Sequence, residues 1–532
     1  MIRLLQRLER ITRHRHSLLA VASSLSIIWL ILTITTISNY PSPMHDEVVW
    51  SSISRQFLEE GNFGYLAFPD LYGLHQNTTF VGRLFVLYIA VTFKLFGFGL
   101  LQARWAQAVV SFACAILLGL SLQRLYSAWT GLLGAALYLF SWNTFYFSHF
   151  VRPEIMGLLG GLGLLYWFVC KHDTASPVTI VGWGMLNALI LDTHLSYAHL
   201  LIALDLVIII DALQRKSLGR ISWLLIGHFV GFLYWIVAHL APNPLLMLKQ
   251  LVAFYGLNIG PAIGIDYKPI TIQQRFITPL THLREYLITF TRLSAFEFSL
   301  LLIAIGTILR HNKRHWIILV PATSLLATIF FLFPSINGAT YIRYLLPFLA
   351  ATMAIAAFEF YSSRRFLAYI YIAGLIVLWV AYIGGNAVLG WNNRDVSENY
   401  KRLRARIDTV VPPTANVLAD EIWFYAFPRE RFSAIRGFTL LNDTPLAINQ
   451  SAIQAYNSLD MYFAERKIDY VLFSEDQFTM FIGPVSLANL RSYLITKCNY
   501  VTTIEGNLYG TEVGSSATTI TVYDCQRRLN VP

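Results

Sequence analysis

The sequence predicts a polytopic α-helical membrane protein, because of its composition and its long apolar runs. Of its 532 residues, 56% are hydrophobic and 13% are charged, whereas soluble globular chains have roughly 45–50% and about 25%. Apolar runs near the ~20 residues that cross a bilayer recur over the first three quarters of the chain. This composition excludes a soluble enzyme.

The positive charge lies in short loops between these runs. Residues 1–394 hold 27 basic and 15 acidic residues, and residues 395–532 hold 13 and 15. Basic residues in alternate loops indicate which loops lie on the cytoplasmic side of a membrane. Their expected partners are the phosphates of lipids rather than those of DNA. We therefore expect no nucleic-acid partner, and a multi-pass protein of a bacterial-type plasma (inner) membrane with a cytoplasmic N-terminus.

About eleven transmembrane helices fit this pattern. The first apolar run is longer than a signal-peptide core and lacks an A-x-A cleavage site, so we expect it to be retained. Residues 83–101 are interrupted by Lys94, and counting them as a span would reverse the sides of all later loops, so we expect a juxtamembrane helix there. The expected spans are 17–38, 105–122, 128–147, 155–170, 178–193, 197–212, 221–240, 296–309, 316–333, 344–361 and 366–388.

Three longer pieces fall outside the membrane in this topology: the first outer loop (39–104), a second loop near 241–295, and the tail. The tail predicts a small C-terminal α/β extracytoplasmic domain at 391–532, which follows a transmembrane domain at 1–390. Its helical and strand-like patterns predict helices at 397–411 and 452–467 and strands at 415–418, 470–473 and 518–523.

Two of the four cysteines, Cys498 and Cys525, fall in this outer domain. An oxidising compartment favours a disulfide between them, and two unpaired cysteines are the alternative.

The first candidate site is the run His45, Asp46, Glu47 in the first outer loop, directly before a helix-like segment at 48–60. Carboxylates at a helix N-terminus are stabilised by the helix dipole, which would explain them as caps. Two adjacent acids beside a histidine also suit proton abstraction or the binding of a divalent metal. Spacing alone does not separate these interpretations.

The second candidate site is the segment with His149, Arg152 and Glu154, where the third span ends on the same outer face. An interfacial Arg–Glu pair at a turn broken by Pro153 is the structural interpretation. The functional interpretation is an arginine that binds phosphate and is oriented by a carboxylate.

Two further outer loops carry ionisable side chains. Asp192, His194 and His199 lie at the outer ends of the fifth and sixth spans, and Arg343 and Tyr344 begin the tenth. Each is often structural when taken singly. Together, four loops with charged groups at one membrane boundary predict a site, because charge there is expensive and tends to be functional.

These residues resemble the membrane glycosyltransferases of the GT-C superfamily, in particular the glycosyltransferase family 39 group of protein O-mannosyltransferases and lipid A aminoarabinose transferases. The resemblance covers most of residues 17–388. The motifs that carry it are Asp46-Glu47 in a long outer loop, Phe93-Lys94-Leu95-Phe96-Gly97, Ala103-Arg104, Arg152-Pro153-Glu154 and Arg343-Tyr344-Leu345-Leu346-Pro347.

The resemblance implies a transferase of the EC 2.4 class, inverting, with a polyprenyl-phosphate sugar as donor and a glycan, lipid or protein hydroxyl as acceptor. It places the base on Asp46, with Glu47 and His45 orienting it or holding a metal. Arg152, Arg343, Tyr344 and, less directly, Arg83 would face the donor phosphate, supported by His149, Glu154 and His194. Val49-Trp50 and the segment before Arg83 depart from the aminoarabinose transferase pattern, which argues against that particular enzyme.

The alternative is a transporter or flippase for a lipid-linked or polar solute. Asp205 and His228 lie within predicted spans and would form its proton relay. Such a protein is expected to show internal repeats and a site at the middle of the membrane, which the sequence does not indicate.

Overall fold

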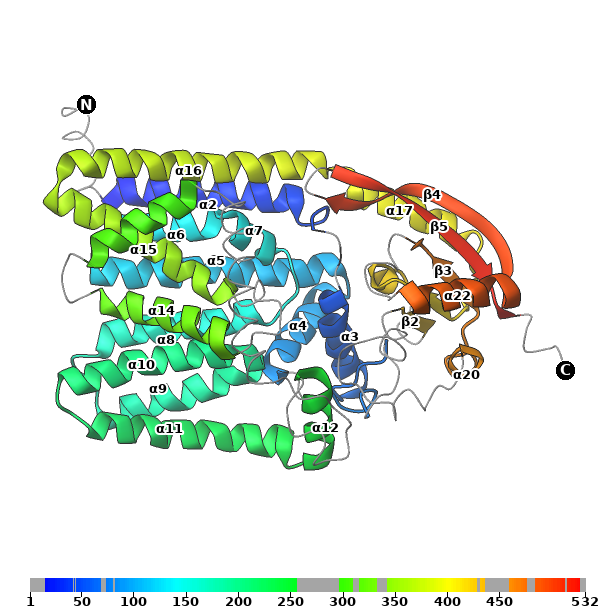
Figure 1. Ribbon diagram of the computed structural model, residues 1–532, viewed down its shortest axis with the longest axis horizontal. Helices are drawn as coiled ribbons and strands as arrows, with labels where there is room; N and C mark the ends of the chain where they lie inside the picture. The colour runs from blue at the N-terminus through cyan, green and yellow to red at the C-terminus, as the bar shows by residue number, and fades with distance from the viewer. Residues whose placement is uncertain are drawn as a thin grey trace.

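The computed structural model describes residues 15–41, 43, 45–67, 73–79, 82–255, 296–309, 315–332, 342–427, 431–435, 459–475, 484–511 and 514–526. Its long helices run side by side in a bundle, and a smaller sheet-containing part lies beyond one end of that bundle (Figure 1). Helices α3 and α4 lie between the two parts.

Seven stretches of the described chain are long and apolar enough to cross a membrane. They contain the helices α2 (Arg15–Thr36), α5 (Leu100–Leu125), α8 (Glu154–Lys171), α10 (Ala198–Gln214), α11 (Gly219–Trp235) with its π-helical extension η3 (Ile236–Leu240), α15 (Ile342–Ser363) and α16 (Arg365–Asn392). Four shorter apolar helices are α6 (Ala128–Phe140), α9 (Pro177–Ile190), Phe296–Leu309 and α14 (Trp316–Leu332). Each expected span coincides with one of these helices, and the number that cross the membrane stays a prediction.

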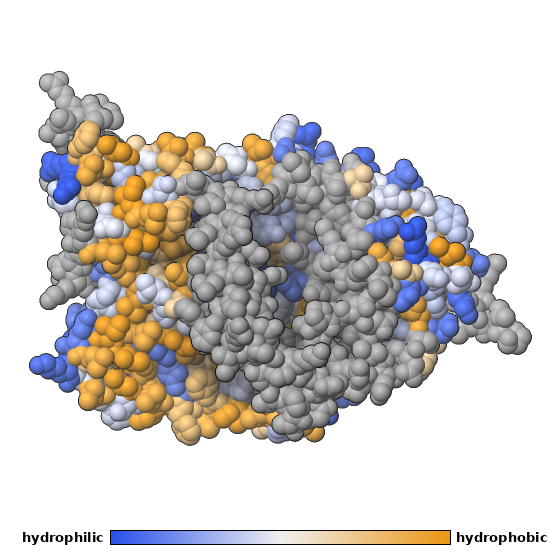
Figure 2. Space-filling view, in the orientation of Figure 1, coloured by the Kyte–Doolittle hydropathy of each residue, from blue (hydrophilic) through white to orange (hydrophobic). Residues whose placement is uncertain are grey.

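The bundle surface is apolar. Large side chains are exposed along its outer helices, including Ile27 of α2, Phe229 of α11 and Val377 of α16. Figure 2 shows this orange surface over the bundle, with hydrophilic residues at its far end and on the sheet-containing part. Exposed apolar side chains on a helical bundle are stable in lipid, where all backbone groups bond within the helices.

Helices α9 and α11 approach each other through glycines. A Cβ on Gly227 would lie 2.2 Å from the carbonyl oxygen of Val181, and one on Gly184 would lie 2.4 Å from that of Leu224. Small residues allow such close backbone contact between membrane helices, where packing rather than the hydrophobic effect holds them together.

Helix α4 (Arg83–Phe96) has 14 residues and is not among the described segments that could cross a membrane. Its side chains Phe85, Ile89 and Phe93 are buried, whereas Leu95 and Phe96 are exposed. The juxtamembrane position of this helix stays a prediction.

The remaining helices of the first part are short and lie at the bundle end. They are α3 (His45–Glu60), α7 (Trp142–Ser148), the 3₁₀ turns η1 (Leu191–Thr193) and η2 (Leu195–Tyr197), and α12 (Pro244–Tyr255). The rest of the expected second outer loop lies outside the described residues.

A five-stranded sheet follows in the order β2-β1-β3-β5-β4. Strands β1 (Val417–Ala419), β2 (Phe432–Ala434) and β3 (Tyr470–Phe473) are parallel, and β5 (Gly514–Asp524) is antiparallel to β3 and to β4 (Asn499–Thr511). The helical elements around it are α17 (Val396–Asp408), η6 (Glu421–Ala426), α20 (Leu459–Glu465) and α22 (Pro484–Lys497). The three predicted strands correspond to β1, β3 and β5, whereas β2 and β4 were not predicted.

The sheet and the helices α3 and α4 share one hydrophobic core. A single cluster of buried side chains includes Val48 of α3, Phe85 of α4, Trp423 of η6 and Val417 of β1. The Tyr425 hydroxyl also lies 2.7 Å from Ser51 Oγ, and its ring stacks on Phe98. These contacts fix the position of α3, whose first turn carries the candidate acids.

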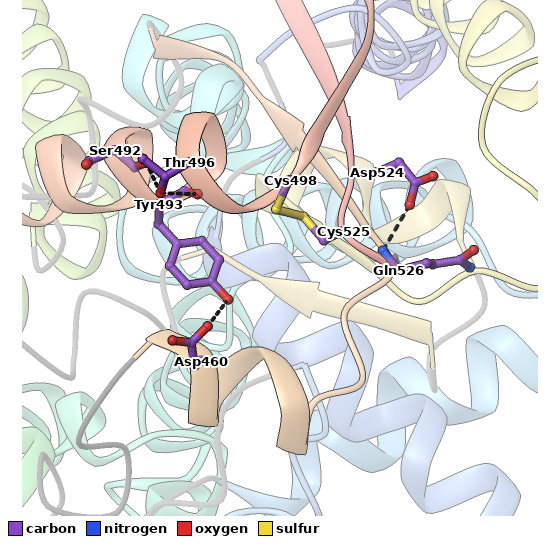
Figure 3. The surroundings of a disulfide bond; sticks show 8 residues. All are labelled: Asp460, Ser492, Tyr493, Thr496, Cys498, Asp524, Cys525 and Gln526. Atoms are coloured by element: carbon purple, nitrogen blue, oxygen red, sulfur yellow. Dashed lines mark hydrogen bonds between the residues drawn. A yellow bond between two sulfur atoms is a disulfide. The ribbon is translucent and has the colours of Figure 1, made fainter. Parts of the chain in front are cut away.

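Cys498 and Cys525 are joined by a disulfide, which is the pairing expected in an oxidising compartment (Figure 3). It links the end of α22 to the residue after β5. Cys114 and Cys170 are free.

Candidate functional site

Four charged side chains from three segments meet at the end of the bundle. Arg152 Nη1 lies 2.7 Å from Asp46 Oδ2, and its Nη2 lies 2.8 Å from Glu154 Oε1. Arg343 Nη1 donates to Glu154 Oε2 at 3.2 Å. Two guanidinium groups and two carboxylates thus form one continuous cluster, which we call the four-charge cluster.

Exposure differs sharply within the four-charge cluster. The side chain of Glu154 is fully buried and that of Arg343 is 6% exposed, whereas Asp46 is 39% exposed and Arg152 18%. The Arg343 guanidinium also lies 3.9 Å from the centre of the Phe147 ring, a cation–π contact. Asp46 and Arg152 are therefore the members that a ligand from solvent or the membrane surface reaches first.

Local structure explains the position of each member. Asp46 lies in the first turn of α3 and Glu154 in the first turn of α8, where a carboxylate is stabilised by the helix dipole. Pro153 precedes α8 as its N-cap residue, and Gln107 Nε2 donates to the carbonyl oxygen of Arg152 at 2.8 Å. The turn that carries Arg152 is thereby anchored to α5.

His194 borders the four-charge cluster between η1 and η2. Its Nδ1 accepts from the backbone N–H of Ser196 and lies 2.6 Å from Ser196 Oγ, and its ring meets the Trp50 ring edge-on. Burial lowers the pKa of His194, and the nearby Arg152 and Arg343 lower it further, against the raising effect of the two carboxylates. The imidazole is therefore neutral at neutral pH.

The Glu47 side chain points away from the exposed side chains of Asp46 and Arg152 and forms a buried ion pair with Arg104. Arg104 Nε and Nη2 each donate to one carboxylate oxygen of Glu47 at 2.9 Å, and its Nη1 donates to the carbonyl oxygen of Ile37. Both side chains are at most 1% exposed. The backbone N–H of Val151, next to Arg152, also donates to Glu47 Oε1. The Glu47–Arg104 pair thus links α3, α5, the Arg152 turn and Ile37, the residue after α2.

His149 and Tyr344 lie in the interior beside the four-charge cluster. His149 Nε2 lies 2.9 Å from Thr36 Oγ1 and its Nδ1 2.7 Å from the carbonyl oxygen of Phe145. Burial, together with the charge of Arg104, lowers the pKa of His149 to about 3. The Tyr344 hydroxyl is buried and lies 3.2 Å from Ser196 Oγ.

Arg83 lies at a second polar group, which is centred on Asp192. The backbone N–H groups of Arg83 and Leu84 and the hydroxyl of Tyr234 point at the Asp192 carboxylate, and His239 Nε2 pairs with it. The Arg83 guanidinium lies over the Phe63 ring. Asp192 therefore caps the N-terminus of α4 and joins it to the turn that carries His194.

Sequence reasoning did not identify several partners of these residues. Arg104 was noted only as part of a motif, and His239 and Gln250 were not singled out. Gln250 Oε1 accepts from Thr79 N–H at 2.8 Å, and His239 Nδ1 lies 2.8 Å from the Thr79 carbonyl oxygen. A π-helical turn at Ile236–Leu240 presents His239 and has no signal in the sequence pattern.

The two members of the proposed transporter relay also lie together. His228 Nε2 is 3.0 Å from Asp205 Oδ2, and Asn187 Nδ2 donates to Asp205 Oδ1. The Tyr197 hydroxyl in turn donates to Asn187 Oδ1. The His228 and Asp205 side chains are 10% and 17% exposed, and polar contacts of this kind between helices are typical of helix packing in membranes.

No three His, Cys, Asp or Glu side chains lie close enough to hold a metal ion among those that the structure describes. The side chain of His45 falls outside the described residues. The carboxylates of Asp46 and Glu47 are directed to different arginines, Arg152 and Arg104, so we assign neither as a metal ligand.

No protein-family model and no curated protein matches the sequence. Solved structures do match. An Archaeoglobus fulgidus oligosaccharyltransferase in complex with Zn and sulfate is 11% identical, with a TM-score of 0.50 over 96% of this chain and 73% of that chain. ArnT from Cupriavidus metallidurans bound to undecaprenyl phosphate is 14% identical, with a TM-score of 0.49 over 95% of this chain and 97% of that chain.

A third match is the archaeal oligosaccharyltransferase AglB from Archaeoglobus fulgidus in complex with an inhibitory peptide and a dolichol-phosphate. It is 11% identical, with a TM-score of 0.47 over 96% of this chain and 74% of that chain. The likeness at a TM-score of 0.50 shows that this chain shares the fold of the Archaeoglobus fulgidus oligosaccharyltransferase.

Proposed function

We propose that this chain, which has the GT-C fold, is a membrane glycosyltransferase that takes a sugar from a polyprenyl-phosphate donor. The observation that carries the proposal is the four-charge cluster, in which a partly exposed carboxylate and a partly exposed arginine sit 2.7 Å apart at one end of the bundle. Transfer of a sugar to a hydroxyl needs a base at the acceptor and positive charge at the leaving phosphate.

Asp46 is the proposed base. Its side chain is the most exposed of the four-charge cluster, so an acceptor hydroxyl can approach it. A single base that activates the acceptor from the side opposite the leaving group gives inversion at the anomeric carbon. Glu47 is assigned a positioning role, because its buried pair with Arg104 fixes the turn that presents Asp46.

Arg152 and Arg343 are the proposed phosphate ligands. Arginine binds phosphate through charge-assisted hydrogen bonds and is weakly hydrated, which suits a site at a membrane boundary. Glu154 is fully buried and contacts both guanidinium groups, so it orients them. Neutral His194, with His149 and Tyr344 behind the site, supports these groups, and Arg83 is a more distant cationic candidate at the start of α4.

The proposed setting is the outer face of a plasma membrane. In this arrangement eleven helices cross the bilayer, the N-terminus is cytoplasmic, α4 lies at the outer surface, and residues 391–532 form an extracytoplasmic domain. The basic loops between spans support this orientation by the positive-inside rule, and the disulfide between Cys498 and Cys525 supports an oxidising compartment for that domain.

The test uses purified full-length protein in liposomes with a panel of polyprenyl-phosphate sugars and a membrane extract as the source of acceptors. We expect release of polyprenyl phosphate with one donor, and that donor names the sugar. If no donor is consumed, while the same liposomes move a lipid-linked or polar solute across the bilayer, the transporter hypothesis replaces this proposal.

A further inference from the structure

The guanidinium of Arg152 pairs with two carboxylates at once. Its Nε and Nη2 edge faces Glu154, at 3.2 and 2.8 Å, and its Nη1 faces Asp46 at 2.7 Å. Of these two carboxylates Glu154 is fully buried and Asp46 is 39% exposed. The buried partner is fixed in the structure, whereas the exposed partner can be displaced or neutralised at low cost.

Among the residues that the structure describes, the formal charges of the four-charge cluster balance. Two arginines oppose two carboxylates, and the neighbouring His194 is neutral. Within the described part of the chain, the titratable or charged groups of the cluster and of the elements that face it include Asp46, Arg152, Glu154, His194, Arg343 and Tyr146. A phosphodiester that enters this balanced site adds an uncompensated negative charge unless one carboxylate leaves or is neutralised.

We infer that Arg152 couples the base to the leaving group. The Asp46 carboxylate pairs with Nη1 of Arg152 until Asp46 takes the proton of the acceptor. The positive charge of Arg152 is then no longer neutralised by Asp46, and it stabilises the leaving phosphate. This inference rests on the proposed function. In this mechanism the Asp46 carboxylate and the donor phosphate compete for the same guanidinium, that of Arg152.

The step balances in atoms and charge. The acceptor oxygen forms its bond to the anomeric carbon and gives its proton to the Asp46 carboxylate, which changes from −1 to 0. The bond between the anomeric carbon and the phosphate oxygen breaks with both electrons on that oxygen, so the phosphodiester at −1 becomes a phosphomonoester at −2. The negative charge lost at one side of Arg152 is gained at the other.

Asp46→Asn reproduces the neutral base permanently and gives a direct test by binding. The probe is undecaprenyl phosphate, titrated into the full-length protein in detergent, with undecaprenol as the uncharged reference. We expect Asp46→Asn to bind the phosphate about tenfold more tightly than the wild type, on the scale of one charge-assisted contact, and Asp46→Ala to show a similar gain. The gain should disappear when Arg152→Gln is added to Asp46→Asn.

A matched control is Arg55→Gln, which removes a charge from the same helix α3. Arg55 pairs with Glu59 and is not part of the four-charge cluster, so we expect wild-type affinity. Equal or weaker binding by both Asp46 variants, with clear binding by the wild type, overturns the coupling and leaves the proposed function standing. Equal binding of undecaprenyl phosphate and undecaprenol by both the wild type and Asp46→Asn overturns both.

Discussion

Glu47 and Arg104 face each other as a buried two-point ion pair between α3 and α5, with both oxygen–nitrogen distances at 2.9 Å. Asp46, the adjacent residue, points instead to Arg152 at the exposed edge. Two adjacent acids in the sequence therefore have different environments: one is enclosed in the interior and the other is available to a ligand.

Removing the buried partner should destabilise the protein strongly. Glu47→Gln leaves the Arg104 guanidinium buried without its counter-charge, which costs about 3–5 kcal/mol in the free energy of unfolding. Thermal unfolding in detergent measures this loss. Arg55→Gln breaks the exposed pair with Glu59 and should cost less than about 1 kcal/mol. Equal unfolding midpoints for the two variants would show that the buried pair contributes little.

Arg343 should affect the use of donor more than the use of acceptor. Its guanidinium contacts Glu154 and the face of the Phe147 ring at once, and a lysine ammonium cannot reproduce both contacts. We expect Arg343→Lys to raise the KM for donor roughly tenfold while the KM for acceptor changes little. Steady-state kinetics with each substrate varied in turn provide the comparison, and an unchanged KM for donor contradicts the assignment.

His149 should make the protein less stable in mild acid. Burial lowers the pKa of His149 from 6.5 to about 3, so between these pH values the unfolded chain binds a proton that the folded protein does not. Stability contributed by this group is therefore complete above pH 6.5 and falls as the pH decreases, by at most about 1.4 kcal/mol per pH unit. His149→Gln should flatten this part of the curve of unfolding midpoint against pH. Parallel curves for variant and wild type refute the prediction.

The disulfide predicts a thiol count. The chain has four cysteines, of which Cys114 and Cys170 are free. Protein denatured without reductant should therefore react with two equivalents of a thiol reagent, and with four after reduction. Four equivalents before reduction would show that Cys498 and Cys525 are not joined.

The sequence predicts much of this architecture because membrane spans are encoded by local composition. Runs of apolar residues identify the helices of the bundle, and Lys94 within a short run predicts a surface position for α4. Strand β4 was not predicted, since the polar and glycine residues of Asn499–Thr511 give little alternation. It forms a strand because it pairs with β5 along almost its whole length.

The candidate site was predicted as a set of residues but not as a set of contacts. Asp46, Arg152, His194 and Arg343 were expected at one membrane surface, and the structure brings them together. The partners within the site are distant in sequence: Arg104 is 57 residues from Glu47, and His239 is 47 residues from Asp192. Composition and periodicity report the local environment of a residue and contain no information on such pairs.

The measurement that tests the central claim most directly is sugar transfer by Asp46→Asn beside a matched control, Glu59→Gln. Both acids lie on α3, and their side chains are 39% and 41% exposed, so the two variants should fold equally well. We predict that Asp46→Asn loses at least about 100-fold in transfer rate, the scale of a general base, and that Glu59→Gln stays within twofold of the wild type. Transfer by Asp46→Asn at the wild-type rate would contradict the assignment of Asp46 as the base.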